Sequence, residues 1–133
     1  MITAQLNTYR QSPRKVRLVS DLVKGKGVVE ALLLLSVTTK EAAGPLHKLI
    51  TSAVKNAKNS FNIEEKNLFV KEFRVDAGAV LKRSMPRARG SAFPILKRTS
   101  HIKLVLGERE GGEKLKTKSV KHTEDSKKEK HNH

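Results

Sequence analysis

The stretch Met85-Pro86-Arg87-Ala88-Arg89-Gly90-Ser91-Ala92 lies between two strand-like runs, and its turn-forming and small residues predict the end of a long β-hairpin. No acidic residue occurs between Asp76 and Glu108, whereas the same window contains seven lysines and arginines and also His101. A two-stranded arm of this kind cannot bury a core of its own, and its positive charge favours a polyanion as its partner. The stretch therefore predicts an arm that inserts into nucleic acid.

Strands are expected on both sides of this turn. Residues 68–76 and 102–106 are rich in β-branched and apolar residues. The first strand is expected to place Phe69, Phe73 and Val75 on one face, with Lys71 as the exception on that face. If residues 70–84 pair with 92–106, fifteen residues at about 3.3 Å each span roughly 50 Å. A globular body of this size has a radius of gyration of about 13–15 Å, so the outer half of the hairpin must project from it.

The residues before the hairpin predict one strand and three helices. Residues 2–6 alternate between apolar and polar side chains, which indicates a half-buried strand. Ser12 is expected to cap a first helix with Pro13 at its first position, and the sequence Lys24-Gly25-Lys26-Gly27 ends that helix. A second helix over residues 28–35 is apolar nearly all round and is expected to be buried.

The third helix has an apolar stripe from Leu46 to Ala57, and Asn59-Ser60 and Asn62 are expected to end it. Thr38 or Thr39 can cap its start, but Gly44-Pro45 interrupts the pattern. Two interpretations remain open, because the helix either begins at Gly44-Pro45 or is kinked there after a first segment that starts near Thr39.

These elements predict an α+β fold, in which three helices pack on a small antiparallel sheet with one long protruding β-hairpin. Residues 1–107 are expected to form the domain, with the extended hairpin at about 78–100. Residues 108–133 combine glycine, lysine and glutamate with almost no apolar side chains, so we expect a disordered charged tail.

The positive charge is concentrated in two blocks. Residues 1–26 have a net charge of +5 and residues 82–107 of +7, whereas residues 27–81 have only +1 and residues 108–133 only +2. Arg14, Lys15 and Arg17 fall in the first turns of a helix, where cations oppose the helix dipole. A bound phosphate explains them better than solvation does. The two blocks therefore predict two footprints on a nucleic acid backbone.

Several functional classes are disfavoured. The chain has no cysteine, no long apolar run that could span a membrane, and no signal-peptide pattern at its start. No arrangement of acids, histidines or serines suggests a catalytic site, so we expect neither an enzyme nor a cofactor. His122, His131 and His133 lack the fixed spacing of a metal site, and no metal is expected.

Four motifs occur in an order that resembles the large-subunit ribosomal protein L twenty-two family of the bacterial or plastid type. They are Ser12-Pro13-Arg14-Lys15-Val16-Arg17-Leu18-Val19, Lys24-Gly25-Lys26, Arg83-Ser84-Met85-Pro86-Arg87-Ala88-Arg89-Gly90 and Lys97-Arg98-Thr99-Ser100-His101-Ile102. The resemblance covers about residues 1–107, and Phe93-Pro94 departs from it, because many bacterial members have charged residues there.

The resemblance implies a structural constituent of the large ribosomal subunit in the cytoplasmic ribosome. Such a protein binds 23S-type large-subunit ribosomal RNA, aids assembly, and lines the nascent-peptide exit tunnel with its hairpin. The residues implied to bind RNA are Arg10, Ser12, Arg14, Lys15, Arg17, Lys24, Lys26, Lys82, Arg83, Met85, Pro86, Arg87, Arg89, Lys97, Arg98, Ser100 and His101. The implied tunnel-lining tip is Arg87, Ala88, Arg89, Gly90, Ser91 and Ala92.

The implied partners are this RNA, neighbouring large-subunit ribosomal proteins and the nascent peptide, with no membrane, and the protein would be a monomer within the ribosome. The alternative is an architectural DNA-binding protein whose basic β-arm inserts a proline into the minor groove. Such proteins normally bend DNA as symmetric dimers, and this sequence offers no strong apolar face for dimerisation.

Overall fold

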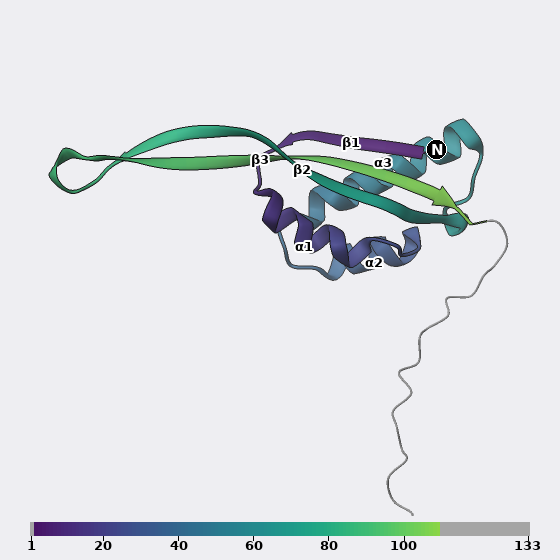
Figure 1. The fold of residues 1–133 in the computed structure, drawn as a ribbon. Coiled ribbons are helices and arrows are strands. Elements are labelled where there is room, and N and C mark those ends of the chain that lie inside the picture. The colour runs from purple at the N-terminus through teal and green to yellow at the C-terminus, as the bar shows by residue number, and fades with distance from the viewer. Residues whose placement is uncertain (1, 110–133) are drawn as a thin grey trace, which may run out of the picture.

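The computed structural model describes residues 2–109 and confirms the α+β fold, with three helices packed on a three-stranded antiparallel sheet and one long hairpin (Figure 1). The elements are β1 (Ile2–Tyr9), α1 (Pro13–Val23), α2 (Val28–Val37), α3 (Ala43–Phe61), β2 (Leu68–Pro86) and β3 (Ala92–Glu108), with short 3-10 turns at Glu65–Asn67 and Ala88–Gly90. The predicted tail beyond residue 109 lies outside the described residues.

The sheet has the strand order β1-β3-β2, so β3 is central and pairs antiparallel with both neighbours. Ile102, Leu104 and Leu106 of β3 point into the core, and Lys103 between the first two is exposed. The three helices cover this face, and the body is therefore a two-layer structure with its core between helices and sheet (Figure 1).

The start of α3 decides between the two interpretations of Gly44-Pro45: the helix begins at this pair and has no earlier segment from Thr39. α3 begins at Ala43, with Ala42 as its N-cap, so Gly44 and Pro45 lie in its first turn. Proline is tolerated there because the first N–H groups of a helix have no partner within it. The expectation that Thr38 or Thr39 caps α3 is wrong, since Thr38 ends α2 and its hydroxyl donates to the Leu34 carbonyl at 2.6 Å.

α2 is not buried all round, and that prediction is wrong. Only Val28, Ala31 and Leu35 are buried. Val29, Leu33 and Val37 follow one another at intervals of four residues and are 48%, 64% and 80% exposed. A nearly uniform apolar composition does not reveal which stripe faces the core, because the hydrophobic pattern then has no helical period.

A bulge at Lys71 changes which side chains of β2 are buried. Val70 pairs with Leu106 and Glu72 with Val105, so Lys71 is an extra residue on β2. Because side chains alternate along a strand, the extra residue exchanges the two faces. Phe73 and Val75 therefore share the core face with Leu68 and Val70 rather than with Phe69, which is only half-buried. The predicted grouping of Phe69 with Phe73 and Val75 is wrong for this reason.

A second bulge lies where the hairpin leaves the body. Ala77 pairs with Ser100 and Val80 with Arg98, so Gly78 and Ala79 face Thr99 alone. The predicted pairing is therefore correct at the base of the hairpin but displaced by two residues near its end, where Ser84 pairs with Pro94 instead of Ala92.

β1 ends its pairing at Ser100, so the hairpin beyond that residue consists of two strands only. We call residues 78–99 the arm; its two strands wind around each other as they leave the body (Figure 1). Almost all arm side chains are exposed, since no helix or third strand covers them.

We predict that Gly78→Ala destabilises the protein. A Cβ at this position would lie 2.5 Å from the Thr99 hydroxyl oxygen and 3.1 Å from His101 Nε2, and Thr99 is held by a hydrogen bond to the Ala79 carbonyl. The expected loss in the free energy of unfolding is about 1–3 kcal/mol, measured by urea denaturation.

Gly44→Ala is the matched control, because a Cβ there meets no atom within 4 Å and the residue is helical. This variant should match the wild type or gain up to about 1 kcal/mol. Equal stability of the wild type and the Gly78→Ala variant would contradict the steric argument.

Candidate nucleic-acid interface

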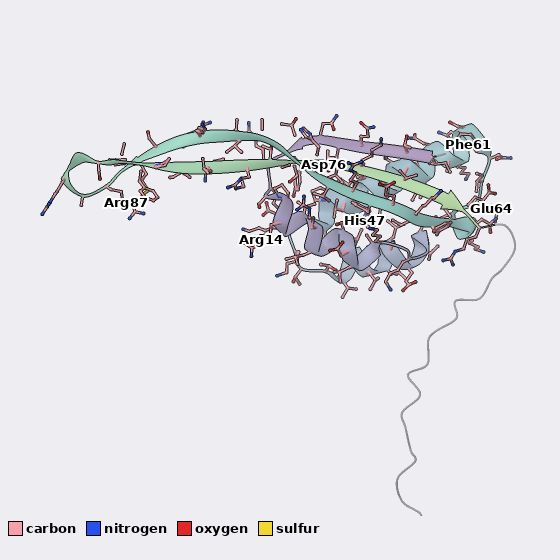
Figure 2. All side chains as sticks on the ribbon, in the orientation of Figure 1. Arg14, His47, Phe61, Glu64, Asp76 and Arg87 are labelled. Carbon is pink, nitrogen blue, oxygen red and sulfur yellow. The ribbon has the colours of Figure 1, made fainter. Side chains whose placement is uncertain are left out.

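The root of the arm is attached to α1 by Arg17. Both Nε and Nη2 of its guanidinium donate to the Val75 carbonyl oxygen, at 3.2 and 3.0 Å. Val75 lies next to Asp76, which Figure 2 shows near the point where the arm leaves the body. Arg17 was predicted to bind RNA; in this structure its side chain fixes β2 to α1.

A second attachment joins the arm to the segment after β1. The Ser100 hydroxyl donates to the Gln11 carbonyl, and Ser100 is fully buried. The backbone N–H of Thr8 donates to His101 Nδ1 at 3.1 Å, which requires Nδ1 to be unprotonated. The Ser100 hydroxyl is therefore engaged inside the protein, away from the exposed surface.

A groove of about 550 Å³ lies between the start of α1 and the inner part of the arm. Its lining residues are Arg10, Gln11, Ser12, Lys15, Glu41, Leu81, Arg83, Leu96, Lys97, Arg98 and Thr99. Five of these residues are lysines or arginines, and Glu41 is the only acid among them. Arg10 and Lys15 of the first basic block thus line the same groove as Arg83, Lys97 and Arg98 of the second.

The local structure leaves polar groups at this groove available. Ser12 occupies the N-cap of α1 as predicted, but its hydroxyl makes no capping hydrogen bond. Pro13 at the first helical position has no N–H to satisfy, and the first turn of α1 contains no acid. Arg14 is exposed near this end of α1, on the side of the body from which the arm extends (Figure 2). The start of α1 is therefore suited to an anion.

Two predicted RNA-binding lysines lie away from the groove. Lys24 and Lys26 follow the opposite end of α1, which is about 16 Å long at 1.5 Å per residue. Their loop pairs with the outer edge of β2, since the Gly25 N–H donates to the Val70 carbonyl and the Val70 N–H to the Lys26 carbonyl, both at 2.9 Å. Lys26 also forms an ion pair with Glu30 at 2.6 Å. Any RNA contact of this loop is separate from the groove.

The tip of the arm is a tight loop beyond the last strand pair, Pro86 with Ala92. The Arg87 N–H donates to the Ser91 carbonyl at 2.8 Å, and Arg89 and Gly90 both have left-handed backbone angles, with φ of 58° and 72°. Glycine adopts this conformation without steric cost, whereas arginine does so only at some cost. All residues from Arg87 to Ala92 are exposed.

The cations of the groove and arm have no acidic partners within residues 2–109. The ion pairs in this part of the chain join Lys26 to Glu30 and Arg74 to Asp76, and neither lies in the groove or on the arm. Partial burial, and secondly the charge of Glu41, raise the pKa of Tyr9 above its usual value, so this phenol stays neutral at physiological pH. Because the cations of the groove and arm have no acidic partner within residues 2–109, their positive charge is left for an external anion to neutralise.

Sequence reasoning did not identify several residues of the groove. Gln11 is one of them, and its side-chain oxygen is buried without a hydrogen-bond partner. Leu81 and Leu96 contribute apolar walls, and Glu41 contributes the single acid. The segment at residues 9–12 is joined to β3 by the Tyr9–Ser100 strand pair and by the Ser100–Gln11 hydrogen bond, and no local pattern in the sequence predicts that hydrogen bond.

Within the described residues, no cluster of histidine, cysteine, aspartate or glutamate could hold a metal ion. The helices of this part of the chain are all too short or too polar to cross a lipid bilayer.

The fold and the groove define a class: an α+β protein in which an extended basic arm and the start of a helix line one positively charged groove. Comparison with known families then identifies it. The model of the family described as ribosomal protein L22p/L17e matches residues 4–107, and the chain belongs to this family.

Three relatives illustrate the similarity, and each is named large ribosomal subunit protein uL22. The protein of Lactobacillus delbrueckii subsp. bulgaricus is 50% identical over 105 residues, covering 79% of this chain and 90% of the relative. That of Lactobacillus helveticus is 47% identical over 106 residues, covering 80% and 91%. That of Clostridium novyi is 51% identical over 100 residues, covering 75% and 90%.

We predict that removing charge from the groove lowers the salt dependence of RNA binding. Lys15→Ala and Lys97→Ala each remove one groove cation that has no acidic partner within residues 2–109. Each lost phosphate contact should reduce the slope of log K against log salt by about 0.7–0.9, measured with purified large-subunit ribosomal RNA. Lys55→Ala, on the exposed side of α3, is the control and should leave the slope unchanged. Unchanged slopes for both groove variants would contradict the assignment.

Proposed function

We propose that this chain binds 23S-type large-subunit ribosomal RNA through the groove and the arm, and that the tip of the arm lines the nascent-peptide exit tunnel. Members of its family are structural, non-enzymatic components of the ribosome. The observation that carries the proposal is that cations from both basic blocks line one groove at the root of an arm that contains no acid.

The groove suits an RNA backbone for physical reasons. Arg10, Arg83 and Arg98 offer planar guanidinium groups that can bind phosphate with two parallel hydrogen bonds, whereas Lys15 and Lys97 act as point charges. Cations stand on both walls, so a strand lying between them can be contacted from two sides. In this proposal the protein holds RNA segments together, which also explains a contribution to assembly.

The arm suits insertion between RNA segments. It is only two strands wide, and successive side chains point to opposite faces, so Lys82 and Arg83 can contact phosphates on different sides. From Gly78 to Pro86 the two-stranded part extends about 30 Å at 3.3 Å per residue. We therefore place the groove and the inner arm against RNA and the tip in the tunnel wall.

Partners and location follow from the same proposal. The chain sits as a monomer in the large subunit of the cytoplasmic ribosome, beside ribosomal RNA and other large-subunit proteins, and its tip meets the nascent peptide. The alternative of an architectural DNA-binding protein requires a stable dimer and tight binding to duplex DNA in competition with RNA. Sizing of the free protein and that competition experiment distinguish the two functions.

Co-sedimentation tests the proposal directly. The tagged full-length chain is expected to remain with large subunits through a high-salt wash, because many phosphate contacts and the inserted arm hold it there. Release of the protein at moderate salt, with no subunit-bound fraction, would refute the proposed role.

We predict that shortening the tip preserves incorporation but alters the tunnel. Deleting residues 85–91 leaves Ala92 and Phe93 as a two-residue connection between Ser84 and Pro94, which are already a cross-strand pair. Changing these two residues to Asn and Gly gives the connection a sequence that favours a two-residue hairpin turn. The tip contributes no buried residue to the core, so the body should fold normally.

The measurements for this variant are the fraction that sediments with large subunits and the chemical reactivity of tunnel-wall nucleotides. Incorporation should equal that of the wild type, and reactivity should change near the tip. Loss of incorporation, or unchanged reactivity throughout the tunnel, would contradict the placement of the tip.

A further inference from the structure

Two large apolar side chains lie uncovered near the end of the arm. Met85 and Phe93 are cross-strand partners, and they are 47% and 58% exposed. Cross-strand partners lie on the same face of a ribbon, so together they form one apolar surface. The core is confined to the body, and no described side chain outside the arm covers this pair. Their exposure costs free energy in the isolated protein and calls for an external partner.

Phe93 also contacts one of the two tip arginines. The Arg87 guanidinium carbon is 5.4 Å from the centre of the Phe93 ring, within the range of a cation–π interaction. Within residues 2–109 such contacts involve Arg87 and Arg109 but not Arg89. Arg87 is therefore held along the arm by an aromatic ring, and Arg89 at the apex of the loop is not.

We propose that Met85, Arg87 and Phe93 form a stacking site for an unpaired nucleobase of the large-subunit RNA, with Phe93 as the positioning residue for Arg87. The proposal rests on the RNA-binding function proposed above and adds a specific contact to it. An aromatic ring and a guanidinium plane both stack on the flat faces of bases, and a thioether adapts to fill the remaining space.

Charge favours RNA over a peptide as the occupant. The arm contains no acid, and its lysines and arginines have no acidic partner within the described residues. A nucleotide supplies both a flat apolar face for Phe93 and a phosphate for the cations, whereas a peptide segment supplies both only when it contains an aromatic residue and an acid. Contact with the nascent peptide is therefore the competing outcome of the experiment.

Photo-crosslinking identifies the occupant. The full-length chain carries p-benzoylphenylalanine in place of Phe93, is assembled into large subunits in cells, and is irradiated after purification of translating ribosomes. We expect an adduct with RNA that stops primer extension at a single unpaired nucleotide. An adduct with the nascent peptide, an adduct with another protein, or the absence of any adduct would overturn the proposal.

Phe61 provides a matched control position. Its ring is 55% exposed, close to the value for Phe93, and it lies at the end of the body opposite the arm (Figure 2). The crosslinker at Phe61 should not stop primer extension at the nucleotide found from Phe93. If subunits contain the crosslinker-bearing protein but the stop is absent, the stacking site fails while the RNA-binding function stands. If the protein does not sediment with subunits, both fail.

A double-mutant cycle tests the positioning role. Phe93→Leu should raise the chemical reactivity of the stacked nucleotide about five-fold or more, because stacking on an aromatic ring contributes at least about 1 kcal/mol per base. Phe93→Tyr, which keeps the ring, should preserve protection. Arg87→Ala should raise reactivity less in the Phe93→Leu background than in the wild type, since the two side chains act together. Strictly additive effects, or loss of protection in Phe93→Tyr, would overturn the positioning role.

Discussion

The direction of the arm depends on a few hydrogen bonds at its root. An arm that buries almost nothing has no packing to orient it, so the bonds from Arg17 to Val75 and from Ser100 to Gln11 fix it to the body. The same bonds determine the shape of the groove, because one wall belongs to the start of α1 and the other to the arm. The Ser100 hydroxyl is buried, so losing its hydrogen bond to Gln11 would leave an unsatisfied polar group in the interior, which is expensive.

Charge places a second condition on the arm. Its cations lie close together on a narrow ribbon without acidic partners among residues 2–109, so they repel one another in the free protein. In the proposed function, an RNA backbone would remove this repulsion by binding the folded arm. Such binding would stabilise the native state by mass action.

The sequence is sufficient to predict the fold class and the elements, because alternation, proline and glycine positions and charge are local signals. The start of α1 at Pro13 and the pairing of Val70 with Leu106 illustrate this. What could not be predicted depends on tertiary contacts. The bulge at Lys71 exchanges the two faces of β2. The nearly uniform apolar composition of α2 does not show which of its residues are exposed. The basic residues are identifiable from charge alone, but their convergence in one groove depends on the segment at residues 9–12 reaching β3, for which no local pattern exists.

The bulges of β2 impose a rule on how the arm can vary in length. Each bulge adds one residue to β2 alone, and together they set which side chains of the two strands share a face at the tip. Adding one residue to each strand would keep the pairing but rotate the tip to the opposite face. Adding two residues to each strand would preserve the orientation and lengthen the arm by about 6.6 Å. The length of such an arm can therefore change only in steps of about 6.6 Å if the tip is to keep the same side chains on the same face.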